Sequence, residues 1–262
     1  MAAPAHSASF MVFTLYTCVA LLALCFMTQL DGLDDEGTWV LDAAALWLDA
    51  LDTGGMLISD PLLILLVPVQ FAFGFACSFV NYYVFGSIIA DSAKLGSRYI
   101  GALSALVCCC GAVMAIPAGW VAKAHGKVGL MVVGSCCLAT VGVGVLLCSN
   151  DQLASWGSII VYLAIYGVGR GIWENTNKAV VADFFSDGAP SASTSAFAAV
   201  AFTSGLSKSI GFFVWPSQPR ETIAVIIVVA SAVSIISYLF AVSLYEVRTK
   251  TVQFAPIVYA PI

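Results

Sequence analysis

The sequence predicts an all-α membrane protein, a polytopic bundle of transmembrane helices. Of its 262 residues 61% are hydrophobic and 10% are charged, and the mean hydropathy is +0.98. Soluble globular proteins average about 45–50% apolar and about 25% charged residues. Seven segments reach the roughly 20 apolar residues that cross a bilayer; they are Phe10–Leu30, Pro61–Ile89, Tyr99–Val121, Val128–Leu147, Trp156–Val181, Thr194–Trp215 and Thr222–Leu244. They are too long for the roughly ten-residue alternation of a β-barrel.

The first segment, Phe10–Leu30, is interpreted as a retained helix rather than a cleaved signal peptide. No Lys or Arg precedes it, and no clear A-x-A cleavage site follows it. The predicted organisation is therefore an N-terminal transmembrane helix (1–30), an acidic loop (31–60), a six-helix bundle (61–247) and a short C-terminal tail (248–262).

Residues 31–60 explain the acidic balance of the chain. The formal net charge is −5, but this interval holds 8 of the 15 acidic residues and no Lys or Arg, so the rest of the chain carries a net charge of +3. Within it, residues 37–52 place Trp and Leu among aspartates at roughly helical spacing. An interfacial amphipathic helix and a solvated linker with some helix both fit. The overall negative charge argues against a nucleic-acid partner.

The basic residues suggest which side of the membrane each loop faces. If the loop after the third segment is cytoplasmic, alternation gives that side five Lys and Arg residues, namely Lys123, Lys127, Lys178, Arg248 and Lys250. The opposite side receives Lys94, Arg98 and Arg220. This distribution agrees with the positive-inside rule and places the acidic loop in the cytoplasm.

The nine cysteines indicate neither a metal site nor a disulfide framework. All lie in apolar segments without a C-x-x-C spacing, and the chain has only two histidines, His6 and His125. Small, polarizable packing residues are the simplest interpretation. No Ser/His/Asp, Cys/His or paired-carboxylate arrangement is present, so we expect neither an enzyme nor a bound cofactor.

Several polar or small residues inside the segments are expected to serve helix packing. Gly111, Ala115 and Gly119 form a stripe at i, i+4 and i+8 that permits close helix approach, and Gln70 and Asn81 suit interhelical hydrogen bonds.

The fifth segment carries the first candidate site. Arg170, Glu174 and Lys178 share one helix face at i, i+4 and i+8, with Tyr166 and Asn177 beside them. At 1.5 Å per residue, Arg170 lies about 16 Å deep, near the midplane of a ~30 Å core. An ion there costs roughly 2.5–3.5 kcal/mol. The stripe is either a self-neutralised ion pair that locks helices together or the wall of a polar cavity.

Glycines surround this stripe but do not form a nucleotide-binding loop. Gly167, Gly169 and Gly171 lie inside an apolar segment without the G-x-G-x-x-G spacing, so close helix packing explains them better.

Lys208, in the sixth segment, is the second candidate. It lies about 18 Å deep when counted from Ala196, at the level of Arg170. Turned inward, it joins Arg170 and Glu174 in an anion-attracting centre; turned outward, it reaches the membrane interface.

The loop between the third and fourth segments carries a third motif. Gly119, Gly126 and Lys127 match the loop signature G-x-x-x-D-R-x-G-R/K. In this loop the chain therefore resembles the major facilitator superfamily. Lys123 replaces the expected acid and Ala124 the expected base. In the family that acid helps to latch two helices, and this chain has a lysine in its place.

The resemblance extends over the last six segments, which look like the C-terminal six-helix half of such a protein. The UNC ("uncoordinated") ion-channel regulatory branch is the most similar, through Gln70-Phe-Ala-Phe-Gly74 and the run Gly167-Val-Gly-Arg-Gly-Ile-Trp-Glu174 that leads to Ala182-Asp-Phe-Phe185. The resemblance implies half of a major-facilitator fold plus one extra N-terminal helix, with residues 31–60 as the cytoplasmic central loop.

The resemblance implies three alternative roles. The chain moves, or once moved, a small solute that can be anionic; or it is a non-transporting regulatory or chaperone subunit of an ion channel or receptor; or it is a truncated fragment of a twelve-helix transporter. Expected partners are the lipid bilayer and a second six-helix half, a copy of the chain, or a client protein. The sequence does not distinguish plasma membrane from endomembrane.

Overall fold

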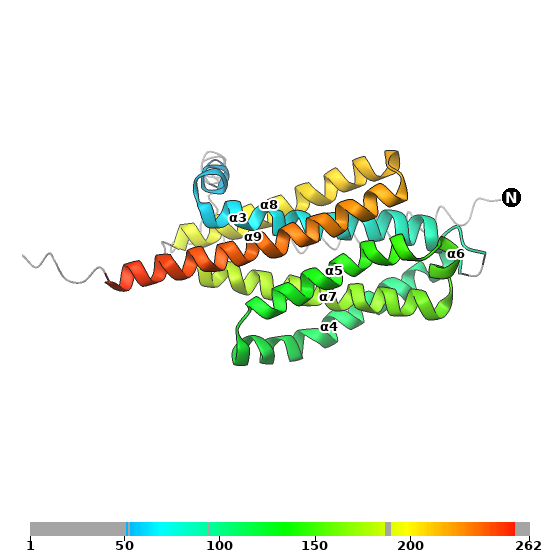
Figure 1. The fold of residues 1–262 in the computed structure, drawn as a ribbon, viewed down its shortest axis with the longest axis horizontal. Helices are drawn as coiled ribbons and strands as arrows, with labels where there is room; N and C mark the ends of the chain where they lie inside the picture. Colours follow the sequence, from blue (N-terminus) through cyan, green and yellow to red (C-terminus); the bar gives the residue numbers. More distant parts are fainter. Residues whose placement is uncertain (1–50, 52, 94, 187–189, 255–262) are drawn as a thin grey trace, which may run out of the picture. The chain divides into compact units, whose positions relative to one another are not determined.

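The computed structural model describes residues 51, 53–93, 95–186 and 190–254, and this part of the chain is mostly helical, without strands. Figure 1 shows the helices in chain order. They are α3 (Pro61–Phe79) with its π-helical continuation η1 (Val80–Ile89), the 3-10 turn η2 (Ser97–Tyr99), α4 (Ile100–His125), α5 (Val128–Leu147), the short α6 (Asn150–Leu153), α7 (Trp156–Phe184), α8 (Pro190–Val214), the turn η3 (Trp215–Ser217) and α9 (Arg220–Phe254).

Local sequence signals set several helix ends. Asp60 caps α3 by accepting a 2.8 Å hydrogen bond from the backbone N–H of Leu62, and Pro61 occupies the first turn, where no N–H is required. Ser149 forms a capping box with Gln152 at α6. Gly126 ends α4 with φ of +82°, a left-handed conformation that glycine adopts without strain.

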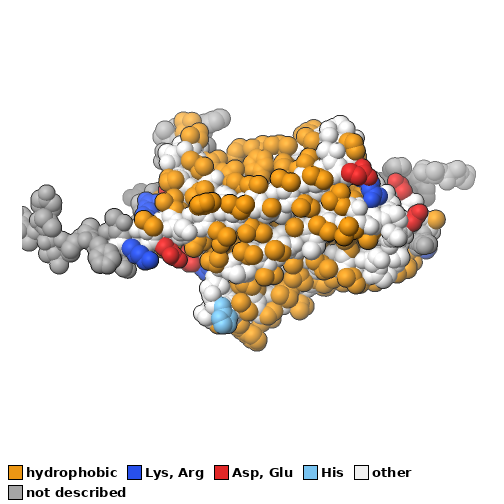
Figure 2. Space-filling model, viewed as in Figure 1, with side chains coloured by type: hydrophobic (Ala, Val, Ile, Leu, Met, Phe, Trp, Pro, Cys, Tyr) orange, Lys and Arg blue, Asp and Glu red, His pale blue; other side chains and the backbone are white. Residues whose placement is uncertain are grey.

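Five stretches are long and apolar enough to cross a membrane, namely Pro61–Ile89, Ser97–His125, Val128–Leu147, Ala192–Ser217 and Arg220–Lys250. The helix α7 is as long as these but carries four charged residues, and it packs against two of the five, α4 and α5. The chain is thus an integral, multipass membrane protein. Figure 2 agrees, because apolar side chains cover the face it shows and charged ones gather toward its two ends.

The six long helices pack in a reciprocal pattern. They form two groups of three, α3, α4, α5 and α7, α8, α9. The first helix of each group packs against the second and third helices of the other: α3 against α8 and α9, and α7 against α4 and α5. The third helices, α5 and α9, pack against each other. Figure 1 shows α9 running beside α3 and α5. Because successive long helices alternate in direction and each group has three of them, α7 runs in the opposite direction to α3. The group α7, α8, α9 is therefore inverted relative to the group α3, α4, α5.

Polar contacts join the helix ends in two sets. At one end, Arg248 lies 3.6 Å from Asp60. At the other, the guanidinium of Arg220 donates to the carbonyls of Val145 and Cys148, at 2.7 and 3.0 Å. Arg248 and Arg220 thus lie at opposite ends of the bundle, as expected if successive loops alternate between the two sides of the membrane. Lys94, which was assigned to the same side as Arg220, lies outside the described residues.

The predicted segments differ from the observed helices mainly at their ends. The helix α9 continues through Arg248 to Phe254, so the first residues after the predicted boundary at residue 248 are helical. Hydropathy marks only the apolar part of a helix, whereas backbone hydrogen bonding continues into polar sequence. The segment Phe10–Leu30 and residues 31–50 lie outside the described part, and residues 53–59 are helical.

Candidate functional site

A cavity of about 360 Å³ opens between α3, α7 and α8. Four residues predicted from the sequence line it, namely Glu174, Asn177, Lys178 and Lys208. The other lining residues are Gln70, Phe73, Trp173, Phe197, Val200, Ala201 and Ser204. Arg170 and Tyr166, which the sequence also predicted, do not line it.

Arg170 is joined to the cavity through Glu174. Its Nε donates to Oε1 of Glu174 at 3.0 Å, one turn further along α7. The two side chains remain 39% and 43% exposed. The pair predicted from the i, i+4 spacing therefore forms, but the surrounding helices do not enclose it.

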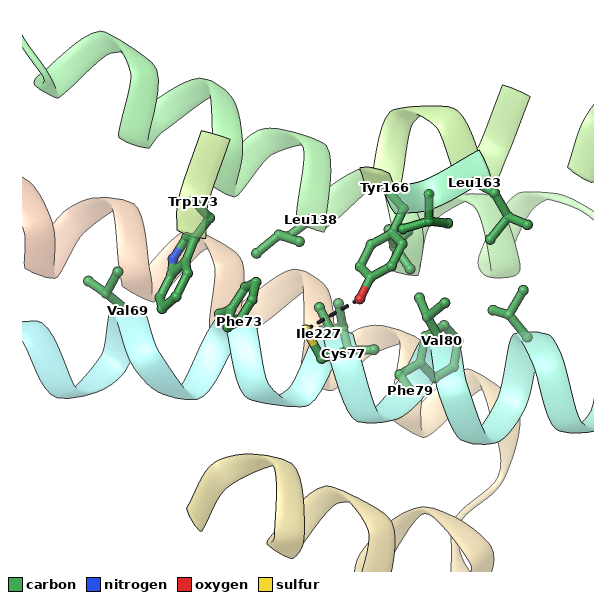
Figure 3. Close-up of a cluster of buried hydrophobic side chains, with 14 of the residues drawn as sticks. Val69, Phe73, Cys77, Phe79, Val80, Leu138, Leu163, Tyr166, Trp173 and Ile227 are labelled. Atoms are coloured by element: carbon green, nitrogen blue, oxygen red, sulfur yellow. Dashed lines mark hydrogen bonds between the residues drawn. The ribbon is translucent and has the colours of Figure 1, made fainter. Parts of the chain in front are cut away.

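Lys208 points into the bundle rather than to the membrane interface. Its ammonium lies 5.0 Å from the centroid of the Phe73 ring, a cation–π distance. Phe73 stacks on Trp173, with ring centroids 3.8 Å apart and planes within 2°, and Figure 3 shows the two rings side by side between α3 and α7. Within the part of the chain that the structure describes, Lys208 has no acidic partner in an ion pair.

The close approach of α3 and α8 fixes the position of Lys208. A Cβ on Gly74 would lie 1.7 Å from Oγ of Ser207 and 2.9 Å from the backbone N of Lys208. The Ser207 hydroxyl also donates to the backbone carbonyl of Gln70, at 3.2 Å. These contacts hold the turn that carries Lys208 directly against α3.

Two buried amides link α3 to α7 at the cavity wall. Nε2 of Gln70 donates to Oδ1 of Asn177 at 3.1 Å, and Nδ2 of Asn177 donates back to Oε1 of Gln70 at 3.4 Å. The predicted interhelical hydrogen bond of Gln70 is confirmed. Asn81, for which the same was expected, is exposed.

Tyr166 belongs to the core below the cavity. Its hydroxyl donates to Sγ of Cys77 at 3.3 Å, the bond drawn dashed in Figure 3. Cys77, buried in α3, lies within electrostatic reach of Arg170, Glu174 and Lys208. Sequence reasoning missed this cysteine, because only the packing of α3 on α7 brings it to the charged residues.

The glycines of α7 serve close packing, as predicted. A Cβ on Gly171 would lie 2.5 Å from the Cα of Gly111 in α4, and one on Gly169 would lie 2.6 Å from the Cβ of Cys137 in α5. The stripe predicted on α4 holds at Gly111 but not at Gly119, where an added Cβ meets no atom within 4 Å. Gly119 lies on an exposed face of α4, whereas its neighbour Ala118 is buried, so the prediction of close packing at Gly119 is wrong.

The loop motif lies away from the cavity. Nζ of Lys127 contacts Oδ2 of Asp183 at 2.5 Å and the carbonyl of Ala179 at 2.9 Å, so it ties the start of α5 to the end of α7. Lys123 is exposed. The motif thus supplies a latch within the bundle through its last residue.

In the described ranges, no group of three or more His, Cys, Asp or Glu side chains is placed to hold a metal ion. The arrangement can instead attract an anion, because Arg170, Lys178 and Lys208 outnumber Glu174. Comparison of the chain with family models, curated proteins and solved structures finds no match.

Proposed function

We propose that the chain is one half of an UNC-like major-facilitator protein and that its cavity forms one wall of a path for a small organic anion. Facilitator halves consist of two inverted three-helix repeats. The reciprocal packing of α3 and α7, each against the second and third helices of the other group, supports this assignment.

The observation that carries the anion path is the ammonium of Lys208, which lines the cavity and forms no ion pair with an acidic side chain of the described residues. With Arg170 and Lys178 it gives the site three cations against one carboxylate, Glu174. Intramembrane ionisable residues generally mark substrate or ion pathways. A cavity of about 360 Å³ falls in the range of small-molecule sites.

A second wall is required for this function. A charged surface facing hydrocarbon is costly, and Arg170 and Glu174 are each about two-fifths exposed. We propose that the six-helix half of a second copy of the chain covers them.

The test is anion uptake by proteoliposomes that contain the full chain, with ¹⁴C-benzoate as the probe. Wild-type protein should give saturable uptake, and Lys208→Gln should abolish it. Lys123→Gln, which removes the same charge from the exposed loop, should leave uptake unchanged. Uptake equal to that of protein-free vesicles, or unaffected by Lys208→Gln, would refute the anion path.

The second candidate is a regulatory or chaperone subunit whose charged wall binds a client's transmembrane helix. The exposure of the Arg170–Glu174 pair favours it. In that case Arg170→Ala should disrupt co-purification of the client, and the proteoliposomes should show no uptake.

A further inference from the structure

Glu174 occupies an unusual place among the charges of the site. It is the one acidic side chain among the described residues that line the cavity. Two of the cations beside it, Lys178 and Lys208, line the same cavity, and the third, Arg170, holds it by a hydrogen bond. The resident anion of this cationic site is therefore a carboxylate supplied by the protein itself.

The hold of Arg170 on this carboxylate is incomplete. One bond joins Nε to Oε1 at 3.0 Å, and the two Nη nitrogens donate to none of the residues described. A guanidinium binds a carboxylate best through two parallel hydrogen bonds. The side chains are also 39% and 43% exposed, so an incoming group can reach them.

From these contacts we infer that Glu174 is a stand-in for the ligand. This inference rests on the proposed anion site. A ligand carboxylate takes the place of Glu174 on Arg170 and is drawn in by Lys208, while the released Glu174 remains in the cavity. The ligand class is thus a small monocarboxylate, and Glu174 is a built-in competitor that lowers its affinity.

The lining limits the rest of the ligand. Phe73, Trp173 and Phe197 supply aromatic carbon beside the amides of Gln70 and Asn177. A cavity of about 360 Å³ has ample room for a ligand with one aromatic ring. Benzoate is therefore a suitable probe, and benzamide is its uncharged match.

The experiment measures equilibrium binding of ¹⁴C-benzoate to the full chain in lipid nanodiscs. Removing the competing charge with Glu174→Gln should tighten binding about tenfold or more, as expected for one charge removed at close range in a medium of intermediate dielectric constant. Glu221→Gln, the same change at an exposed residue near the start of α9, should leave the affinity unchanged. Benzamide should not compete.

A double variant shows whether the gain acts through Arg170. In the Arg170→Gln background, Glu174→Gln should tighten binding by a smaller factor, because no guanidinium is released and only the repulsion between Glu174 and the ligand is removed. Size-exclusion profiles and melting temperatures of each variant report folding separately. If Glu174→Gln misfolds, Glu174→Ser provides the same loss of charge with a smaller side chain and should also tighten binding.

The results separate this inference from the proposed function. Benzoate binding that depends on Lys208 but is unchanged or weakened by Glu174→Gln would overturn the stand-in role and leave the anion site in place. Absence of binding in the wild type, with binding in Glu174→Gln, would support the stand-in role. Absence of binding in both would overturn the two proposals together.

Discussion

Replacing Gly74 with alanine should separate α3 from α8 and disturb the site. A Cβ at Gly74 would lie 1.7 Å from Oγ of Ser207 and 2.7 Å from its Cβ. The hydroxyl can rotate away, but the Cβ cannot, so α8 must move by about 0.7 Å to restore an ordinary 3.4 Å contact. Overpacking of this kind costs about 1–3 kcal/mol, whereas a glycine-to-alanine change in a helix otherwise gains up to about 1 kcal/mol.

The expected net effect is a loss of about 1–2 kcal/mol in the free energy of unfolding, together with weaker benzoate binding because Lys208 shifts off Phe73. Unfolding by SDS in mixed micelles measures the first and nanodisc binding the second. Gly205→Ala is the matched control, since an added Cβ there meets no atom within 4 Å. A second substitution, Ser207→Gly, should recover part of the stability lost in Gly74→Ala. Equal stability of Gly74→Ala and Gly205→Ala would refute the reasoning.

Two further predictions concern contacts outside the charged pair. Leucine substitutions at Gln70 and Asn177, combined in a double-mutant cycle, should give a coupling free energy of about 0.6–1.7 kcal/mol, as for hydrogen bonds between membrane helices; additive losses of stability would contradict the paired amides. Lys127→Met should lower the free energy of unfolding by up to about 1 kcal/mol, since its partner Asp183 is half exposed. Lys123→Met, at an exposed position four residues away, should change stability by less, and the opposite order would contradict the latch at Lys127.

Hydropathy was sufficient to locate the six long helices among the described residues, five of which are long and apolar enough to cross a membrane. It did not locate the helix ends, such as the extension of α9 through Arg248 to Phe254. The i, i+4 rule predicted the pairing of Arg170 with Glu174, which depends on one helix alone. These features are local, and local features can be predicted from one sequence.

Features that depend on how two helices meet were harder to predict. The orientation of Lys208 stayed open between cavity and interface, because the close contact of Gly74 with Ser207 decides it. The bond from Tyr166 to Cys77 was missed for the same reason, since the two residues lie 89 positions apart. Gly119 was assigned a packing role that its position on α4 does not allow.

The most direct test of the cationic cavity uses a cysteine introduced at Ala201, one of its lining residues. The full chain in nanodiscs is treated with anionic sulfonatoethyl or cationic trimethylammonium-ethyl methanethiosulfonate, and modification at residue 201 is quantified by peptide mass spectrometry. A net positive cavity concentrates anions, so the anionic reagent should react faster there, relative to a free thiol in solution, and Lys208→Gln should reduce that preference. Faster reaction with the cationic reagent, or no reaction with either, would contradict an anion-attracting cavity.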